Sequence, residues 1–378
     1  MKYPLLPYSQ LVFDMLKTNP DVYYTRFGLR VDKREVDVQR LKKAIELTLQ
    51  NHPVFSMHVD EKGMQEYMPA DDIFHGQYHS VDFCDEAEYV RIDIAYNRIL
   101  GDALSGHVWM NSLFRAYQGL PLQPDNYLTY LSRIELDKQS PRHAADREWL
   151  QQEFDNITCP VHPITDVSLN TVCVPMAGTL LDNYSDLKER LNVLEEEHLV
   201  SLTAVFSLAS ALAIMEYNHT DKAALTWAYD GREKPEDLYM YGSLHRDIPF
   251  EINLQSPMSN NQSYLIRETR NQFRSGIAHS HYPWTLTPPH TDIWNYALNV
   301  LVQPSLEQLI KKSPFAFEVV APTEESQVAY ALLDVEIHED SQLTLLYRYS
   351  ATHYKESSIE KFAALVRKYV EWLLKNEK

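Results

Sequence analysis

The sequence is poor in cysteine and in positive charge, and both shortages restrict what the protein can do. Only three cysteines, Cys84, Cys159 and Cys173, occur among 378 residues, and no CxxC or CxxH pair is present. The usual zinc spacing is therefore absent, and buried thiols in a reducing compartment are favoured. With 35 Lys+Arg against 53 Asp+Glu, the net charge is −18, and no basic cluster exists to neutralise phosphates. We expect neither a nucleic-acid partner nor binding to an anionic membrane surface.

Signature motifs of several enzyme classes are also missing. The chain has no GxxxxGK(S/T) loop, GxGxxG turn, HExxH or GxSxG, which argues against nucleotide, dinucleotide, zincin and α/β-hydrolase chemistry. His279 and His281 share a proline-containing loop, but a third ligand is lacking and no metal is expected. We also expect no bound cofactor.

The hydrophobic runs do not indicate membrane insertion. The first residues lack the apolar stretch of a signal peptide. The uncharged run 199–215 is marginal in length for a membrane span and contains four hydroxyl side chains. We therefore expect a cytoplasmic protein in which this run is a buried core helix.

Length and patterning predict two domains of mixed structure. A chain of 378 residues with 44% hydrophobic and 23% charged residues suits two globular domains. Hydrophobic periodicity predicts strands at 25–31, 55–59, 89–94, 171–175, 223–229, 296–302, 328–337 and 343–349. It predicts helices at 38–50, 103–117, 147–154, 199–215 and 358–374. Residues 159–166 (CPVHPITD) are interpreted as the linker, so that the domains are 1–160 and 161–378. The fold class is α+β, with two similar sandwich-like halves.

One local region stands out as a functional candidate. The predicted strand at 89–94 is followed by Tyr96 to Ser105 (YNRILGDALS), which leads into a predicted helix. The start of a helix offers free backbone donors and commonly hosts function. Asp102 can also serve simply as the N-cap of that helix.

This region resembles the His-His-x-x-x-Asp-Gly motif of condensation domains. The aligned residues are Asn97, Arg98, Asp102 and Ala103, followed by Ser105, and only the Asp and the Ser match. Six further segments resemble other motifs of those domains in the same order: 5–10 (LLPYSQ), 51–59 (NHPVFSMHV), 229–232 (YDGR), 241–250 (YGSLHRDIPF), 279–284 (HSHYPW) and 345–349 (LLYRY). Nearly the whole chain is thus similar to the nonribosomal peptide synthetase condensation-domain superfamily.

The resemblance implies an architecture and a class of substrate. It implies two chloramphenicol-acetyltransferase-like α/β sandwich lobes that form a V-shaped pseudo-dimer, with a tunnel past the motif at their junction. Donor and acceptor thioesters would enter on phosphopantetheine arms of carrier proteins, or as coenzyme A thioesters. The expected partner is a carrier protein or a synthetase module, and the chain is expected to stand alone.

The same resemblance shows where this chain departs from the family pattern. Arg98 replaces the second His of the motif, and guanidinium has no acceptor and cannot act as a general base. Arginine can instead hold an anion or stabilise an oxyanion. Ala103 replaces a Gly and adds a methyl at the expected channel, and Arg246 stands where Asn is usual. Ser105 and Gly242 are also expected to line the channel, and Asp102 is expected to form a structural salt bridge.

Two interpretations remain open at this point. The first is a binding or recruitment module with impaired or altered catalysis, which the resemblance supports because one branch with Arg at this position serves as a docking platform for oxygenases. The second is an active acyltransferase that moves an acyl or aminoacyl group to an amine or hydroxyl, with His107 or His245 as the replacement base. A structural protein with no ligand has no positive feature in its favour.

Overall fold

A computed structural model describes most of the chain and divides it into two compact units. The described residues are 1–17, 20, 24–69, 71–168, 178–255, 261–280, 298–303, 305–320 and 332–375. The first unit comprises Met1–Pro141, Asp230–His245 and Pro304–Val328. The second comprises Arg142–Tyr229, Arg246–Gln303 and Ala329–Lys378. This division differs from the predicted lobes 1–160 and 161–378, because two later segments belong to the first unit.

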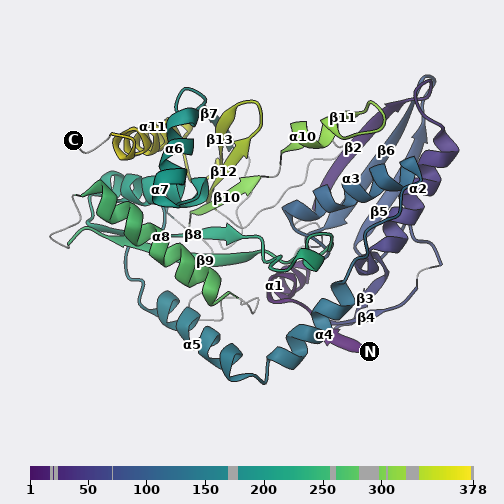
Figure 1. Cartoon of the computed structure of the whole chain (residues 1–378), viewed down its shortest axis with the longest axis horizontal. Helices are drawn as coiled ribbons and strands as arrows, with labels where there is room; N and C mark the ends of the chain where they lie inside the picture. Colours follow the sequence, from purple (N-terminus) through teal and green to yellow (C-terminus); the bar gives the residue numbers. More distant parts are fainter. Residues whose placement is uncertain are drawn as a thin grey trace. The chain divides into compact units, whose positions relative to one another are not determined.

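The first unit is built on a four-stranded antiparallel sheet with the order β11-β2-β6-β5 (Figure 1). Its strands are β2 (Tyr24–Asp32), β5 (His79–Asp85), β6 (Tyr89–Asn97) and β11 (Glu318–Val320). Buried and partly buried residues alternate along β6, as expected for a half-buried strand. Strand β11 approaches β2 closely at Gly28, where a Cβ atom would lie 2.5 Å from Val320 Cγ2.

Helices cover one face of this sheet. The first unit contains α1 (Pro7–Leu16), α2 (Val38–Asn51), α3 (Ala103–Gln118), α4 (Tyr127–Asp137) and α10 (Leu306–Lys311), with a short helix η2 (Pro235–Asp237). A small sheet has the order β1-β4-β3, with β1 (Lys2–Pro4), β3 (Met57–Val59) and β4 (Met64–Tyr67). Helix α3 begins with a capping box between Asp102 and Ser105 and ends at Gly119 in the left-handed region, φ 73°.

The second unit contains a six-stranded mixed sheet with the order β7-β13-β12-β10-β8-β9 (Figure 1). Its strands are β7 (Gly178–Asn183), β8 (Lys222–Tyr229), β9 (Arg246–Asn253), β10 (Asn299–Gln303), β12 (Leu333–Glu339) and β13 (Leu343–Tyr349). Its helices are α5 (Pro141–Asp155), α6 (Lys188–His198), α7 (Leu202–Asn218), α8 (Gln262–Ala278) and α11 (Glu356–Leu373). Strand β10 runs parallel to β8 and β12, and the other described pairings are antiparallel.

Helix α7 is the buried core helix that the uncharged run predicts. Every residue from Ala204 to Met215 is buried, and the helix packs within the main hydrophobic cluster of the second unit. Among the described residues no single helix is long and apolar enough to cross a membrane, and only α6 and α7 taken together pass that test, across a bend of 103°.

Two predicted segments differ in the structure. Only Met57–Val59 of the strand predicted at 55–59 is extended, because Pro53–Ser56 form a 3-10 helix, η1, with proline at its first position. The predicted linker 159–166 packs in the second unit: the carbonyl of Pro160 accepts from Ala224 N at 3.0 Å, and that of Val161 accepts from Leu298 N at 2.8 Å. The strand predicted at 171–175 lies outside the described residues.

Candidate functional site

The motif region is the turn between β6 and α3 in the first unit. Asn97 ends β6, is fully buried, and accepts from Ile99 N through its side-chain oxygen at 3.0 Å. The carbonyl of Ile99 accepts from the buried Ser9 hydroxyl of α1 at 2.9 Å. Gly101 lies against the ring of Tyr241, because a Cβ atom there would be 2.6 Å from Tyr241 Cε1. The turn is therefore fixed on several sides.

Asp102 is held by a buried ion pair with Arg232. Its two carboxylate oxygens accept from the two terminal nitrogens of Arg232, each at 3.1 Å, and the side chains are 5% and 0% exposed. Leu244 N donates to the same carboxylate at 2.9 Å. Burial acts to raise the pKa of Asp102, but the Arg232 charge and the hydrogen bonds outweigh it and hold the pKa below its usual value. Asp102 is thus held as an anion in the salt bridge that the sequence analysis expected.

Ser105 completes this network from the first turn of α3. Its hydroxyl lies 2.8 Å from Asp102 Oδ1 and 2.9 Å from the carbonyl of Gly242, and Gly242 N donates to it at 3.2 Å. Arg232 also donates to the carbonyl of Met240, at 3.1 and 3.2 Å. Ser105 and Gly242 are both buried and bonded to each other, and their place beside a channel stays a prediction.

Arg98 and Ala103 are the motif residues that reach the surface. Both are exposed, whereas Asn97 and Asp102 are buried. Burial raises the pKa of the Tyr96 phenol. The nearby charge of Arg98 acts in the opposite direction but is the smaller effect. At the position expected for a base, the structure therefore presents a solvent-accessible, permanently charged guanidinium.

The two alternative bases have different surroundings. His107, on α3, has Nε2 3.2 Å from the carbonyl oxygen of Ser305, so this nitrogen carries the proton and donates. His245 packs edge-on against Tyr8, with ring centroids 4.1 Å apart. The Nδ1 atom of His245 is buried and has no hydrogen-bond partner among the described residues. A neutral imidazole keeps one unprotonated nitrogen in either place, so the two rings differ in their contacts rather than in their capacity to accept a proton.

The remaining predicted residues belong to the second unit. Arg246 is buried and begins β9, where it pairs with Tyr229 of β8. His279, at the end of α8, stacks on Trp149 at 4.6 Å and binds Asp146 Oδ1 through Nδ1 at 2.9 Å. His281 lies outside the described residues. The described part of the chain holds no cluster of three or more metal-ligating side chains.

A second buried network supports the same segment of the first unit. His52 Nδ1 lies 2.6 Å from Asp125 Oδ2, and His52 Nε2 lies 3.0 Å from Ser112 Oγ. The order Ser–His–Asp is that of a hydrolase triad, but Ser112 is only 7% exposed and His52 only 1%. The same Asp125 oxygen accepts from Tyr241 N at 2.9 Å. This set therefore fixes the 240–244 segment that carries the Asp102 contacts.

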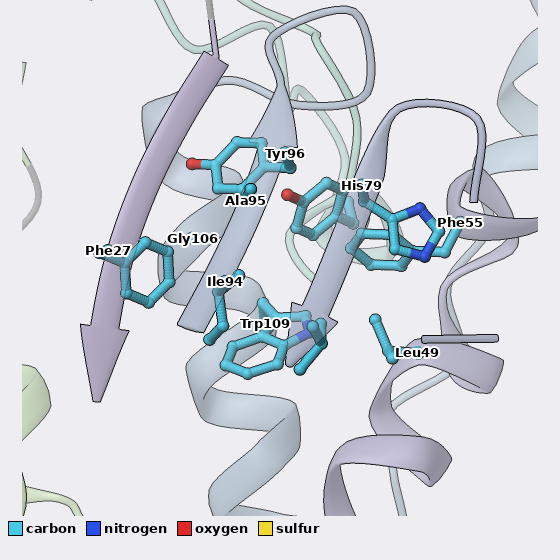
Figure 2. Close-up of a pocket in the computed structure, with 11 residues that line it drawn as sticks. Phe27, Leu49, Phe55, His79, Ile94, Ala95, Tyr96, Gly106 and Trp109 are labelled. Carbon is cyan, nitrogen blue, oxygen red and sulfur yellow. The ribbon is translucent and has the colours of Figure 1, made fainter. Parts of the chain in front are cut away.

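A small apolar cavity lies beside the motif, between the sheet and helices α2 and α3 (Figure 2). Its volume is about 10 Å³, close to what one water molecule needs. Phe27, Ile94, Trp109, Tyr96 and Tyr241 are among the residues that line it. All of its lining residues belong to the first unit.

Comparison with known proteins identifies the family. A family model described as "Condensation domain" matches residues 94–378. The chain therefore belongs to the condensation-domain family. One of the plipastatin synthase subunits of Bacillus subtilis (strain 168) is 25% identical over 199 residues, which cover 50% of this chain and 8% of that protein. The chain thus corresponds to a small part of that relative.

Solved structures show the same fold at low sequence identity. The epimerization domain from the third module of tyrocidine synthetase B has a TM-score of 0.77 at 15% identity, covering 99% of this chain and 97% of that chain. The X-domain in complex with OxyB from teicoplanin biosynthesis also has a TM-score of 0.77, at 13% identity, covering 99% and 93%. A mutant starter condensation domain of rhizomide synthetase in complex with C8-CoA has a TM-score of 0.72 at 12% identity, covering 99% and 94%.

Three residues of this condensation-domain site were not predicted as site residues. They are Arg232, Asp125 and Tyr241. Arg232 and Tyr241 fall in segments that resemble family motifs. The sequence therefore identified these segments but did not predict which residues Arg232 and Tyr241 contact. Asp125 follows Pro121 and Pro124 in a stretch with no periodicity, and no sequence signal identified it.

Proposed function

We propose that this condensation-domain protein binds a thioester-loaded carrier protein, or a coenzyme A thioester, and recruits a partner without forming the peptide or ester bond itself. The observation that carries the proposal is the state of the motif. Both carboxylate oxygens of Asp102 are bonded to Arg232. The position of the expected base holds the exposed Arg98. A guanidinium cannot take a proton from an acceptor amine.

The charge of Arg98 suits binding better than proton transfer. A guanidinium forms strong bidentate hydrogen bonds with carboxylates and phosphates. The phosphate of a phosphopantetheine arm and the phosphates of coenzyme A have this chemistry. In a protein with a net charge of −18, an exposed arginine beside the motif gives such an anion a local point of attraction.

The structural relatives support both parts of the proposal. One neighbour, an X-domain, is solved with OxyB, which is a protein–protein complex on this fold. Another, a starter condensation domain, is solved with C8-CoA, which is a thioester complex. Both are below 25% identical to this chain, so the fold alone is shared.

An active acyltransferase is the second candidate, and His245 is the observation that favours it. Its buried Nδ1 has no hydrogen-bond partner among the described residues, and its ring is held edge-on against Tyr8. This candidate requires that His245→Ala abolish a measured acyl-transfer rate. If His245→Ala and His107→Ala both leave such a rate unchanged, the candidate fails.

Carrier binding is the direct test of the recruitment proposal. Immobilised protein is exposed to carrier proteins with and without the phosphopantetheine arm, and binding is followed by biolayer interferometry. We expect the loaded form to bind more tightly, and Arg98→Glu to remove most of this difference. Arg34→Ala is the control, because Arg34 is an exposed arginine away from the motif. It follows the end of β2 that pairs with Tyr89, whereas the motif residue Asn97 pairs with the other end of β2. Equal binding of both carrier forms would contradict the proposal.

A further inference from the structure

Strand β7 (Gly178–Asn183) forms one edge of the six-stranded sheet in the second unit (Figure 1). Among the described residues it pairs with β13 only. An edge strand presents main-chain donors and acceptors that can pair with another chain. We propose that β7 pairs antiparallel with β7 of a second copy of this chain, so that the two sheets join into one. This association does not depend on the proposed function, because the motif belongs to the first unit.

The register with β13 shows which main-chain groups of β7 face outward. Tyr184 N donates to the carbonyl of Leu343 at 2.8 Å, which continues the β7–β13 pairing just past the strand. Hydrogen-bonded and non-hydrogen-bonded pairs alternate in an antiparallel ladder, so Thr179, Leu181 and Asn183 direct their N–H and C=O groups away from β13. The contact of Arg367 Nη1 with the carbonyl of Asn183, at 2.6 Å, agrees with this orientation.

The side chains of β7 offer little protection against such pairing. Its six residues, GTLLDN, include no lysine and no proline, which are the residues that commonly block an edge strand. Leu181 is 64% exposed, although it lies opposite Leu346 of β13. The single charged side chain, Asp182, lies 3.8 Å from Arg367, so a nearby positive charge already compensates it.

The opposite edge of the sheet, β9, is closed by contrast. The N–H of Glu251 donates to Gln272 Oε1 at 3.3 Å, and its C=O accepts from Gln272 Nε2 at 2.9 Å. A side chain of α8 thus occupies the main-chain groups that a further strand would need at this point. Pro249, in the same strand, has no N–H to offer. Of the two edges, β7 is therefore the one that suits another strand.

A register centred on Leu181 makes β7 complementary to itself. Leu181 then faces Leu181 of the second copy, and Thr179 faces Asn183. Pairing at these positions provides up to about six main-chain hydrogen bonds between the copies, and the two leucines form an apolar cross-strand pair. Asp182 faces Leu180 in this register. A register that placed Asp182 opposite Asp182 would be disfavoured, because like charges directly opposite each other are destabilising.

The dimer is expected to be weak and to depend on salt. A strand of six residues is about 20 Å long, and pairing along one such edge buries less than the roughly 1,200 Å² of a standard interface. The net charge of −18 on each copy opposes association, and salt screens this repulsion. We therefore expect a dissociation constant on the order of 10–100 μM, which decreases as the salt concentration rises.

Sedimentation velocity of the full chain tests the proposal over protein concentrations from about 1 to about 200 μM, at low and at high salt. We expect a monomer–dimer equilibrium that Leu181→Lys weakens at least about tenfold. Leu199→Lys is the matched control, because Leu199 is 65% exposed in the same unit but outside β7. It makes the same change of charge and should leave the equilibrium unchanged.

Hydrogen exchange gives a second measurement that reports on the strand itself. The amides of Thr179, Leu181 and Asn183 should exchange more slowly as the protein concentration rises, because only the dimer pairs them. Thr179→Pro removes one outward N–H without adding a charge and should also weaken the dimer. A wild type that remains monomeric at every concentration, or a dimer that survives both β7 substitutions, would overturn the proposal.

Discussion

The terminal nitrogens of Arg232 each lie 3.1 Å from one carboxylate oxygen of Asp102, so this ion pair is bidentate and almost completely buried. The pair links the first turn of α3 to the 230–245 segment of the same unit. A buried charge that loses its partner is strongly destabilising, whereas an exposed pair contributes little. The motif aspartate is therefore expected to matter for folding more than for proton transfer.

Asp102→Asn should destabilise the protein by about 3 kcal/mol, the lower end of the range for a broken buried ion pair, because Arg232 loses its buried carboxylate and keeps only that of Asp230, which is 40% exposed. The free energy of unfolding from urea denaturation measures this loss. Asp14→Asn is the control, since its ion pair with Lys17 is about half exposed and should contribute about 0–1 kcal/mol. Equal small losses in both variants would show that the buried pair is not a structural link.

The stability contributed by Asp102 should depend on pH in a defined direction. Its pKa is lower in the folded protein than in the unfolded chain, so its contribution is complete above the unfolded value of about 3.9. It is lost as the pH falls through the lower folded value. The difference in unfolding free energy between wild type and Asp102→Asn should be constant from neutral pH to about pH 5 and shrink below about pH 4. A difference that grows on acidification would contradict the lowered pKa.

Gly101→Ala and Gly106→Ala should have opposite effects although they lie five positions apart. A Cβ atom at Gly101 would approach Tyr241 Cε1 to 2.6 Å and Ser105 Cβ to 2.9 Å, and such overpacking typically costs about 1–3 kcal/mol. Gly106 lies within α3 with room for a methyl, where Ala is favoured over Gly by up to about 1 kcal/mol. Thermal denaturation of both variants is the measurement. If Gly101→Ala is as stable as wild type, the contact with Tyr241 does not fix the turn.

Ser112→Ala should reduce stability without removing any hydrolytic activity. The substitution leaves His52 Nε2 without its partner at 3.0 Å, which costs about 1–3 kcal/mol for a buried group. Hydrolysis of p-nitrophenyl acetate should be indistinguishable from the background rate in wild type and variant alike. A wild-type hydrolysis rate that Ser112→Ala abolishes would show that the buried Ser–His–Asp set is catalytic.

Local signals made parts of the fold predictable from the sequence. Helix α3 was predicted over 103–117 and spans Ala103–Gln118, because its capping residue Asp102 and its terminating Gly119 are adjacent in sequence to its two ends. The strand predicted at 25–31 spans Tyr24–Asp32, since its alternation is clear. The 3-10 helix at Pro53–Ser56 was missed because four residues carry too little periodicity to separate it from a strand.

Long-range relationships were not predictable in the same way. Strand β11 has only three residues, which is too short for a recognisable alternation of side chains. It is a strand because it pairs with β2, far away in sequence. Ser105 bonds a residue 137 positions away, Gly242, so its burial could not follow from the local pattern around the motif. Asp102 was expected to form a salt bridge, but its partner could not be predicted. Arg232 lies 130 positions away in the sequence, and only the folded structure places the two side chains in contact.

The most direct test of the central claim is a condensation assay with an acyl-loaded donor carrier and an aminoacyl-loaded acceptor carrier, followed by mass spectrometry. The account predicts no product above the protein-free control for the wild type, together with retention of the loaded carrier. Product formed by the wild type and lost in Arg98→Ala would contradict it, and would make Arg98 a working residue of an acyltransferase.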